Sequence, residues 1–183
     1  YLIKKIDKRY LRYCHIVFVL IILQGIVGWY MVTSGLVNNT SVSHYRLSLH
    51  LSIAFIIISI IFWNLLNIKK NTFSSFFKNV KYNYFFYLLF FLMFSQVVMG
   101  AFVSGLDAGR IYQNWPLMGK YYFPDDIILI ELKDFVDFNN HSLVQFYHRN
   151  IAYLILIYIS LLGYLIFKKK LLNLFKPFYY VLF

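Results

Sequence analysis

The sequence has 183 residues, of which 61% are hydrophobic and only 14% are charged, whereas an ordinary soluble domain carries about 25% charged residues. The formal net charge is +11, but the basic residues gather beside apolar runs, at 4–12, 69–81 and 168–176, which is typical of membrane-flanking segments and not of a nucleic-acid site. A single cysteine, Cys14, excludes an internal disulfide and a thiolate zinc site.

Four apolar segments are each long enough to cross a bilayer as a helix, at about residues 14–32, 47–66, 84–103 and 146–167. The connection 67–83 contains four lysines and no acidic residue, whereas the connection 104–145 contains six acidic and three basic residues. The positive-inside rule therefore predicts that both ends of the chain face the cytoplasm and that 104–145 lies outside. We expect an all-α polytopic membrane protein.

The order of these segments predicts two helical hairpins. Residues 1–66 form the first hairpin, 67–83 a cytoplasmic linker, and 84–183 the second hairpin, which includes the outer loop 104–145. A loop of about forty residues is usually functional or contains structure of its own. We expect this loop to lie over the membrane and not to form a separate domain.

Two histidines lie inside apolar runs of similar sequence, which start His50-Leu-Ser-Ile-Ala-Phe and His148-Arg-Asn-Ile-Ala-Tyr. Each is followed about 20 residues later by lysines, a helical distance of about 30 Å, so both should lie at the same depth near the outer face. A second repeat supports a duplicated architecture: Gln24-x-x-x-Gly28 precedes the first histidine, and Gln96-x-x-x-Gly100 precedes the second.

Ionisable groups within a membrane are rare and usually functional, and neutral imidazole is a common axial ligand of haem iron. Paired histidines at one depth therefore indicate haem binding by His50 and His148. Alternatively, His50 could only bond to a neighbouring helix, and His148 with Arg149 could only cap its helix at the interface. Arg149 has no acidic residue within one turn, so an anionic cofactor would supply its counter-charge. Arg46, one turn before His50, could pair with haem propionates or reach lipid phosphate.

The remaining polar residues near these segments offer weaker candidates. His141 would share a helix face with the fourth-segment histidine, but 139–142 has the composition of a loop or helix cap. His44 precedes the second segment and is expected to face solvent. Asp107 and Arg110 are expected to form an exposed ion pair, which would contribute little stability.

Several strings in this chain resemble haem A synthase, the membrane enzyme that converts haem O to haem A. The matching strings are Gln24-Gly25-Ile-Val-Gly28-Trp29-Tyr30-Met31-Val32-x-Ser34-Gly35-Leu36, Val42-Ser43-His44-Tyr45-Arg46-Leu47-x-Leu-His50-Leu51, Gly100-Ala101-x-Val103-x-Gly105-Leu106-Asp107-Ala108-Gly109, Asn114-x-Pro116-Leu117-Met118-Gly119 and Gln145-Phe146-x-His148-Arg149. They occur in order across most of residues 24–153.

The resemblance implies an eight-helix protein of two similar four-helix halves, in which this chain supplies about helices three to six. His50 would be the catalytic, iron-binding histidine of the half that takes haem O as substrate. His148 would bind the iron of a permanent haem b, with Arg149 and Arg46 as cofactor-binding residues. The sequence by itself would also allow His50 and His148 to share one iron, and the resemblance argues against that.

The resemblance further implies oxidation of a porphyrin methyl to a formyl group, with oxygen and an external electron donor such as a ferredoxin-type protein. Implied partners are membrane lipid, a haem O synthase or a second copy of the chain, but no nucleic acid. The location would be the cell inner membrane, or the mitochondrial inner membrane in a eukaryote. Some members of the family carry a cysteine pair in their outer loops. No cysteine lies in the outer segments of this chain, so the resemblance is to the proteobacterial and mitochondrial type.

Two alternatives remain open, a b-type cytochrome that transfers electrons and a transporter with structural histidines. The chain begins at Tyr1 without a methionine and ends in an aromatic run, so we expect a piece of a longer protein. It lacks the acidic residue expected near the second-helix histidine and the partner ligands of His50 and His148. The piece alone is therefore expected to be inactive.

Overall fold

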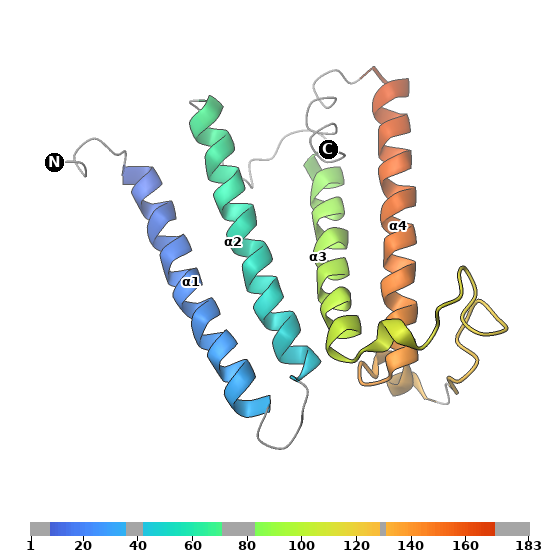
Figure 1. Ribbon diagram of the computed structural model, residues 1–183. Coiled ribbons are helices and arrows are strands. Elements are labelled where there is room, and N and C mark those ends of the chain that lie inside the picture. The colour runs from blue at the N-terminus through green and yellow to red at the C-terminus, as the bar shows by residue number, and fades with distance from the viewer. Residues whose placement is uncertain (1–7, 36–41, 71–82, 129–130, 171–183) are drawn as a thin grey trace.

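The computed structural model describes residues 8–35, 42–70, 83–128 and 131–170, and these contain four long helices. The helices are α1 (Lys8–Gly35), α2 (His44–Lys70), α3 (Asn83–Gly105) and α4 (His141–Lys168). Two short 3₁₀ helices, η2 (Ala108–Arg110) and η3 (Leu132–Val136), lie between α3 and α4 (Figure 1). The predicted all-α architecture is confirmed, and the helices extend beyond the predicted apolar cores at most ends.

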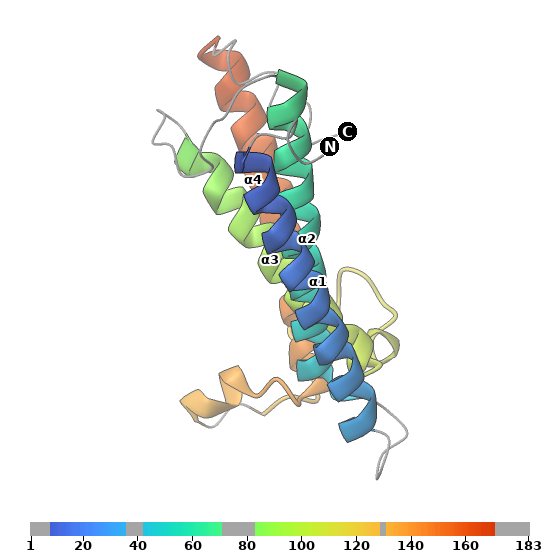
Figure 2. The same cartoon turned by 90° about the vertical axis from the view of Figure 1, so that its left-hand side faces the viewer.

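The four helices run alternately up and down in one row and follow one another in chain order (Figure 1). Each helix packs against the next one along the chain. In the view turned by 90°, the helices overlap one another, which shows that the row is a single layer (Figure 2). The segment between α3 and α4 therefore lies at the same end as the start of α2. We call this segment, residues 106–140, the outer segment and this end of the row the outer end, after the orientation predicted from the sequence.

All four helices are long and apolar enough to cross a membrane. Their large side chains are widely exposed, for example Phe18, Trp29 and Phe91, which are more than 60% exposed. Water would not solvate such a surface favourably, whereas lipid or further helices would. Most of the predicted linker 67–83 lies outside the described residues, as do 171–183.

The two hairpins meet where α2 packs on α3. At the outer end, a Cβ on Gly105 would lie 2.7 Å from Cβ and 2.8 Å from Cα of His44, so only glycine permits this approach. His44 is consequently 7% exposed and packs edge-on against Phe102. The expectation that His44 faces solvent is wrong, because the junction between the hairpins covers it.

The second hairpin is closed by contacts at both ends. At the outer end, Met99 and Phe102 of α3 pack with the buried Val144 of α4. Further along, the Tyr158 hydroxyl on α4 donates to the Phe85 carbonyl on α3 at 2.9 Å. The two helices that carry the second repeat are thereby fixed against each other.

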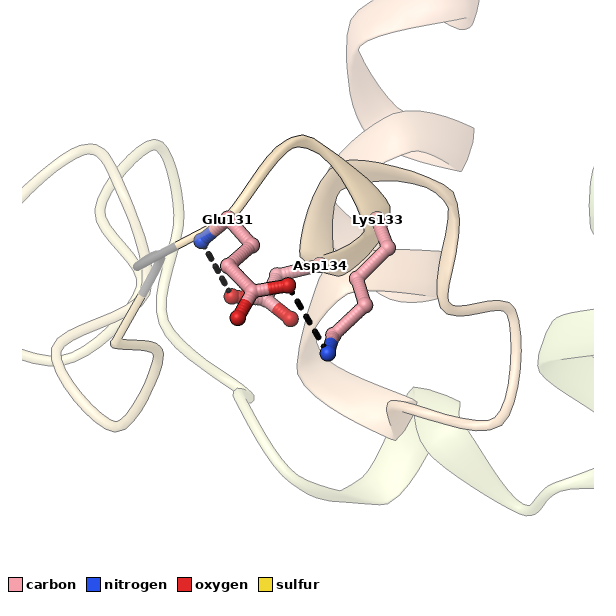
Figure 3. A network of polar contacts seen from close by, with 3 residues as sticks. All are labelled: Glu131, Lys133 and Asp134. Carbon is pink, nitrogen blue, oxygen red and sulfur yellow. Dashed lines mark hydrogen bonds and ion pairs between the residues drawn. The ribbon is translucent and has the colours of Figure 1, made fainter.

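The outer segment is built from turns and not from a separate folded unit. Gly119 has a φ of +83°, and a Cβ there would overlap the Asp125 carboxylate, so the turn requires glycine. In η3, the Glu131 amide donates to the Asp134 carboxylate at 2.8 Å, and Lys133 pairs with Glu131 (Figure 3). The Asn140 side chain then caps α4 by accepting from Leu143 N at 3.0 Å.

Candidate functional site

His50 lies about two turns into α2, and its ring rests against α1. A Cβ placed on Gly28 would be 3.1 Å from Cε1 and 3.4 Å from Nδ1 of His50. The imidazole therefore occupies space that any larger residue at position 28 would fill. The Nδ1 atom is buried and has no hydrogen-bond partner.

His148 has the equivalent environment in the second hairpin. It lies about two turns into α4, and a Cβ placed on Gly100 of α3 would be 3.2 Å from its Cε1 and 3.7 Å from its Nδ1. Its Nδ1 is likewise buried without a partner. Its other ring nitrogen, Nε2, lies 3.3 Å from the side-chain amide nitrogen of Gln96.

Both imidazoles are chemically suited to bind the iron of a haem. A neutral imidazole has one donor and one acceptor nitrogen, so a ring with its proton on the buried Nδ1 presents the lone pair of Nε2, which a haem iron can take. The porphyrin nitrogens already bind the iron, so the protein needs to provide only one imidazole on one face of the haem. His50 and His148 could each provide that imidazole.

The two rings do not face a common space between helices. His50 contacts α1 through Gly28, whereas His148 contacts α3 through Gly100. Since the helices follow one another in a row, the rings belong to different helix pairs (Figure 1). This arrangement favours one haem for each histidine over a shared iron.

Arg46 is placed one turn before His50, as the sequence indicates, but its guanidinium points to α1. The guanidinium carbon lies 4.8 Å from the centre of the Tyr30 ring. A cation–π contact of this kind contributes about 0.5–1 kcal/mol at an exposed site. It joins the outer ends of α1 and α2 beside the first histidine.

Arg149 is engaged by the outer segment. Its guanidinium donates to the carbonyls of Tyr112 at 2.5 Å, Asn114 at 2.8 Å and Leu117 at 3.4 Å. Carbonyl oxygens thus satisfy the charge for which the sequence predicted an anionic cofactor. The predicted contact between Arg149 and a haem remains a prediction, and these carbonyls would compete with it.

Three further candidates have the following surroundings. His141 is the exposed first residue of α4, on the same helix as His148. Asp107 and Arg110 form no ion pair, although both lie in the described part of the chain, so that expectation is wrong. Instead, Asp107 adopts a left-handed conformation, and its carbonyl accepts from the Arg110 amide at 3.1 Å.

Gln145 begins one of the strings that resemble haem A synthase, but sequence reasoning assigned it no role; it is 4% exposed on α4. Its amide donates to the carbonyl of Tyr112 at 2.9 Å and to that of Gly109 at 3.4 Å, and its oxygen accepts from Tyr112 N. Gln145 and Arg149, on successive turns of α4, therefore bind the same stretch of the outer segment, residues 109–117. The signal available in the sequence was a glutamine one turn before an arginine at the start of an apolar segment.

Tyr112 also anchors this segment through two carboxylates. Its hydroxyl is shared between Asp125 at 2.8 Å and Asp126 at 2.7 Å, and Asp126 also accepts from Ser142 of α4 at 2.6 Å. Burial and these hydrogen bonds raise the pKa of Tyr112 well above 10.0. The hydrogen bond from Tyr112 lowers the pKa of Asp125.

The chain matches the family model described as cytochrome oxidase assembly protein over residues 1–182. It is 47% identical to the Heme A synthase of Pelagibacter ubique over 84% of this chain and 45% of the relative. It is 38% identical to the Heme A synthase of Flavobacterium psychrophilum, over 91% of this chain and 48% of the relative.

A third relative, the Heme A synthase of a Wolbachia pipientis strain from Culex pipiens, is 38% identical over 77% of this chain and 43% of its own length. The chain thus spans about half the length of these relatives. No solved structure matches it. The resemblance found in the sequence is confirmed, and the chain belongs to the cytochrome oxidase assembly protein family.

Proposed function

We propose that this chain forms part of an enzyme that converts haem O to haem A in a bacterial inner membrane, or in the mitochondrial inner membrane of a eukaryote. In this proposal, His148 would hold the iron of a resident haem b, and His50 would be the catalytic histidine that holds the substrate haem. An external donor, such as a ferredoxin-type protein, supplies electrons. The ends of the chain face the cytoplasm.

The observation that carries the proposal is the repeated histidine environment. Two imidazoles lie about two turns inside the outer helix ends, in separate helix pairs, and each has a buried nitrogen without a partner. An enzyme with a resident and a substrate haem needs two separate sites of this kind. The relatives named Heme A synthase support the same assignment.

In the mechanism, a bound haem iron supplies the one-electron and oxygen chemistry. The protein orients the two haems, and the imidazoles of His50 and His148 fix their irons. Gln145 and Arg149 hold the outer segment on the end of α4 that carries His148. This segment therefore lies against the outer end of the second hairpin.

The test uses the protein expressed from its complete gene in cells that make haem O but not haem A. Haems are extracted and separated by chromatography for the wild type and for His148→Ala and His141→Ala. We expect haem A from the wild type and from His141→Ala, because His141 is an exposed residue on the same helix. We expect none from His148→Ala.

The other outcomes identify the alternatives. If haem B is bound but no haem A forms, while haem O and a competent electron donor are shown to be present, the protein is an electron-transfer cytochrome. A folded protein without any haem would be a transporter with structural histidines. Equal haem A production by wild type and His148→Ala would reject His148 as an essential ligand.

A further inference from the structure

We propose that Gly28 and Gly100 are positioning residues, each of which forms one wall of a slot that fixes the ring of a single haem-ligand histidine. The first slot consists of Gly28 and His50, and the second of Gly100 and His148. The inference rests on the proposed function in that it treats these histidines as ligands of two haems. It adds a residue in each hairpin that controls the direction of the ligand.

The contact distances show how little space each slot leaves. An added Cβ would lie 3.1 Å from the first ring and 3.2 Å from the second, which is tighter than nine in ten real Cβ contacts. The neighbour in both slots is an imidazole, which is rigid and is joined to its helix by a single methylene group. One methyl group would therefore displace each ring by a few tenths of an ångström.

A displacement of this size matters for a metal ligand. Distances between a metal and its ligands are held within about 0.2 Å, so a shift of a few tenths changes bond length or ring tilt. The edge in contact with each glycine is formed by Cε1 and Nδ1, so the shift also rotates the ring nitrogens. Ring orientation and hydrogen bonding in turn tune a bound metal.

The chain supplies a matched control on the same helix as the first slot. Gly25 lies one turn before Gly28 on α1, and a Cβ there meets nothing within 4 Å. Both positions are helical, so replacement by alanine has the same effect on helix propensity. Only the variant at position 28 adds a methyl group against an imidazole.

The first experiment requires no haem. The protein expressed from its complete gene is labelled with ¹⁵N-histidine, purified without haem, and measured as wild type, Gly25→Ala, Gly28→Ala and Gly100→Ala. We expect the ring signals of His50 to shift in Gly28→Ala and those of His148 to shift in Gly100→Ala. Gly25→Ala should leave both unchanged, and thermal melts should show that all variants fold.

The second experiment measures the electron paramagnetic resonance spectrum of the ferric protein after haem loading. The signal of the haem bound by His148 is identified as the one that His148→Ala removes. Gly100→Ala should change this signal, and Gly28→Ala should leave it unchanged. The proposal is overturned if both glycine variants match Gly25→Ala in the ring signals. It is also overturned if each variant disturbs both histidines equally, because the glycines would then serve general packing.

The two experiments separate this inference from the proposed function. If the wild type binds no haem, the proposed function fails, yet the ring signals still show whether each glycine fixes its own histidine. If haem A is produced but the glycine substitutions change neither the ring signals nor the spectra, the proposed function is supported and the slots are rejected.

Discussion

Gln96 contacts a candidate ligand histidine at a ring nitrogen. If its amide donates to Nε2 of His148 at 3.3 Å, the ring proton is on Nδ1 and Nε2 presents the lone pair that iron would take. Binding of haem would then break a hydrogen bond of about 1 kcal/mol. Gln96 therefore stabilises the haem-free state.

We predict that Gln96→Leu lowers the stability of the haem-free protein by about 1 kcal/mol and tightens haem binding about fivefold. Haem titration and thermal melts measure the two effects. Gln24→Leu is the control, because Gln24 occupies the equivalent place in the first hairpin but makes no hydrogen bond to His50, both being described residues. Weaker haem binding by Gln96→Leu would show that Gln96 supports the ligand.

Gly119 is the residue at which the outer segment tolerates no side chain. Alanine would combine an unfavourable positive φ with overlap against the Asp125 carboxylate. Strain of this kind costs about 1–3 kcal/mol. We predict that Gly119→Ala increases cleavage of the outer segment in limited proteolysis, whereas Gly109→Ala, where a Cβ would make an ordinary 3.6 Å contact with Val103, does not.

At the residue scale, the sequence identified the histidines because a polar group within an apolar run is conspicuous. It did not identify their neighbours. Gln96 and His148 are separated by 52 residues, so only the packing of α3 on α4 brings them together. The burial of His44 has the same origin, since it depends on contact with Gly105 of another hairpin.

Among the elements, the outer segment is fixed to α4 by hydrogen bonds as well as by aromatic packing, for example of Phe123 on Phe146. Arg149 and Gln145 bind its carbonyls, and Ser142 binds Asp126. The sequence predicted a loop over the membrane, but it assigned Arg149 to a cofactor because hydrogen bonds to backbone carbonyls leave no trace in composition. An arginine in this position can therefore order the segment without any anion.

The Tyr112 cluster makes the docking of this segment dependent on pH. The pKa of Asp125 is below 3.8 when docked, so its contribution is complete above about pH 4 and is lost as the pH falls further. The pKa of Tyr112 is raised above 10.0, so its contribution is complete below about pH 10 and is lost as the pH rises beyond that.

We therefore predict that hydrogen exchange in residues 112–128 is slowest between about pH 4 and pH 10, after correction for the intrinsic rate. Tyr112→Phe should remove the shared hydroxyl and reduce protection about fivefold, in line with a loss of about 1 kcal/mol. Tyr121→Phe is the control, because Tyr121 is 66% exposed. Equal protection in Tyr112→Phe and wild type would show that the carboxylates do not anchor the segment.

For the molecule as a whole, the length of the apolar runs and the charge of the connections predicted the helices and their order, because a bilayer permits few alternatives. The helix ends were placed less well, since α4 begins at His141 and not near Phe146. This difference puts His148 in the second turn of the helix. The sequence could not show that the helices form a single row, nor that each imidazole packs against the other helix of its own hairpin.

The row has one basic end and one acidic end. The starts of α1 and α3 and the ends of α2 and α4 lie together, and the outer segment lies at the opposite end (Figure 1). Lys168, Lys169 and Lys170 are exposed at the first end, whereas Lys133 lies in the outer segment with a side chain that is 74% exposed. These positions allow the orientation in the membrane to be measured directly.

We predict that an impermeant maleimide labels Lys133→Cys in intact spheroplasts and labels Lys169→Cys only after the membrane is opened. Both variants are made with Cys14→Ser, which removes the one cysteine of these 183 residues. The result follows from the positive-inside rule, because the lysine-rich end should remain in the cytoplasm. Labelling of Lys169→Cys but not Lys133→Cys in spheroplasts would reverse the topology and place both candidate histidines near the cytoplasmic face.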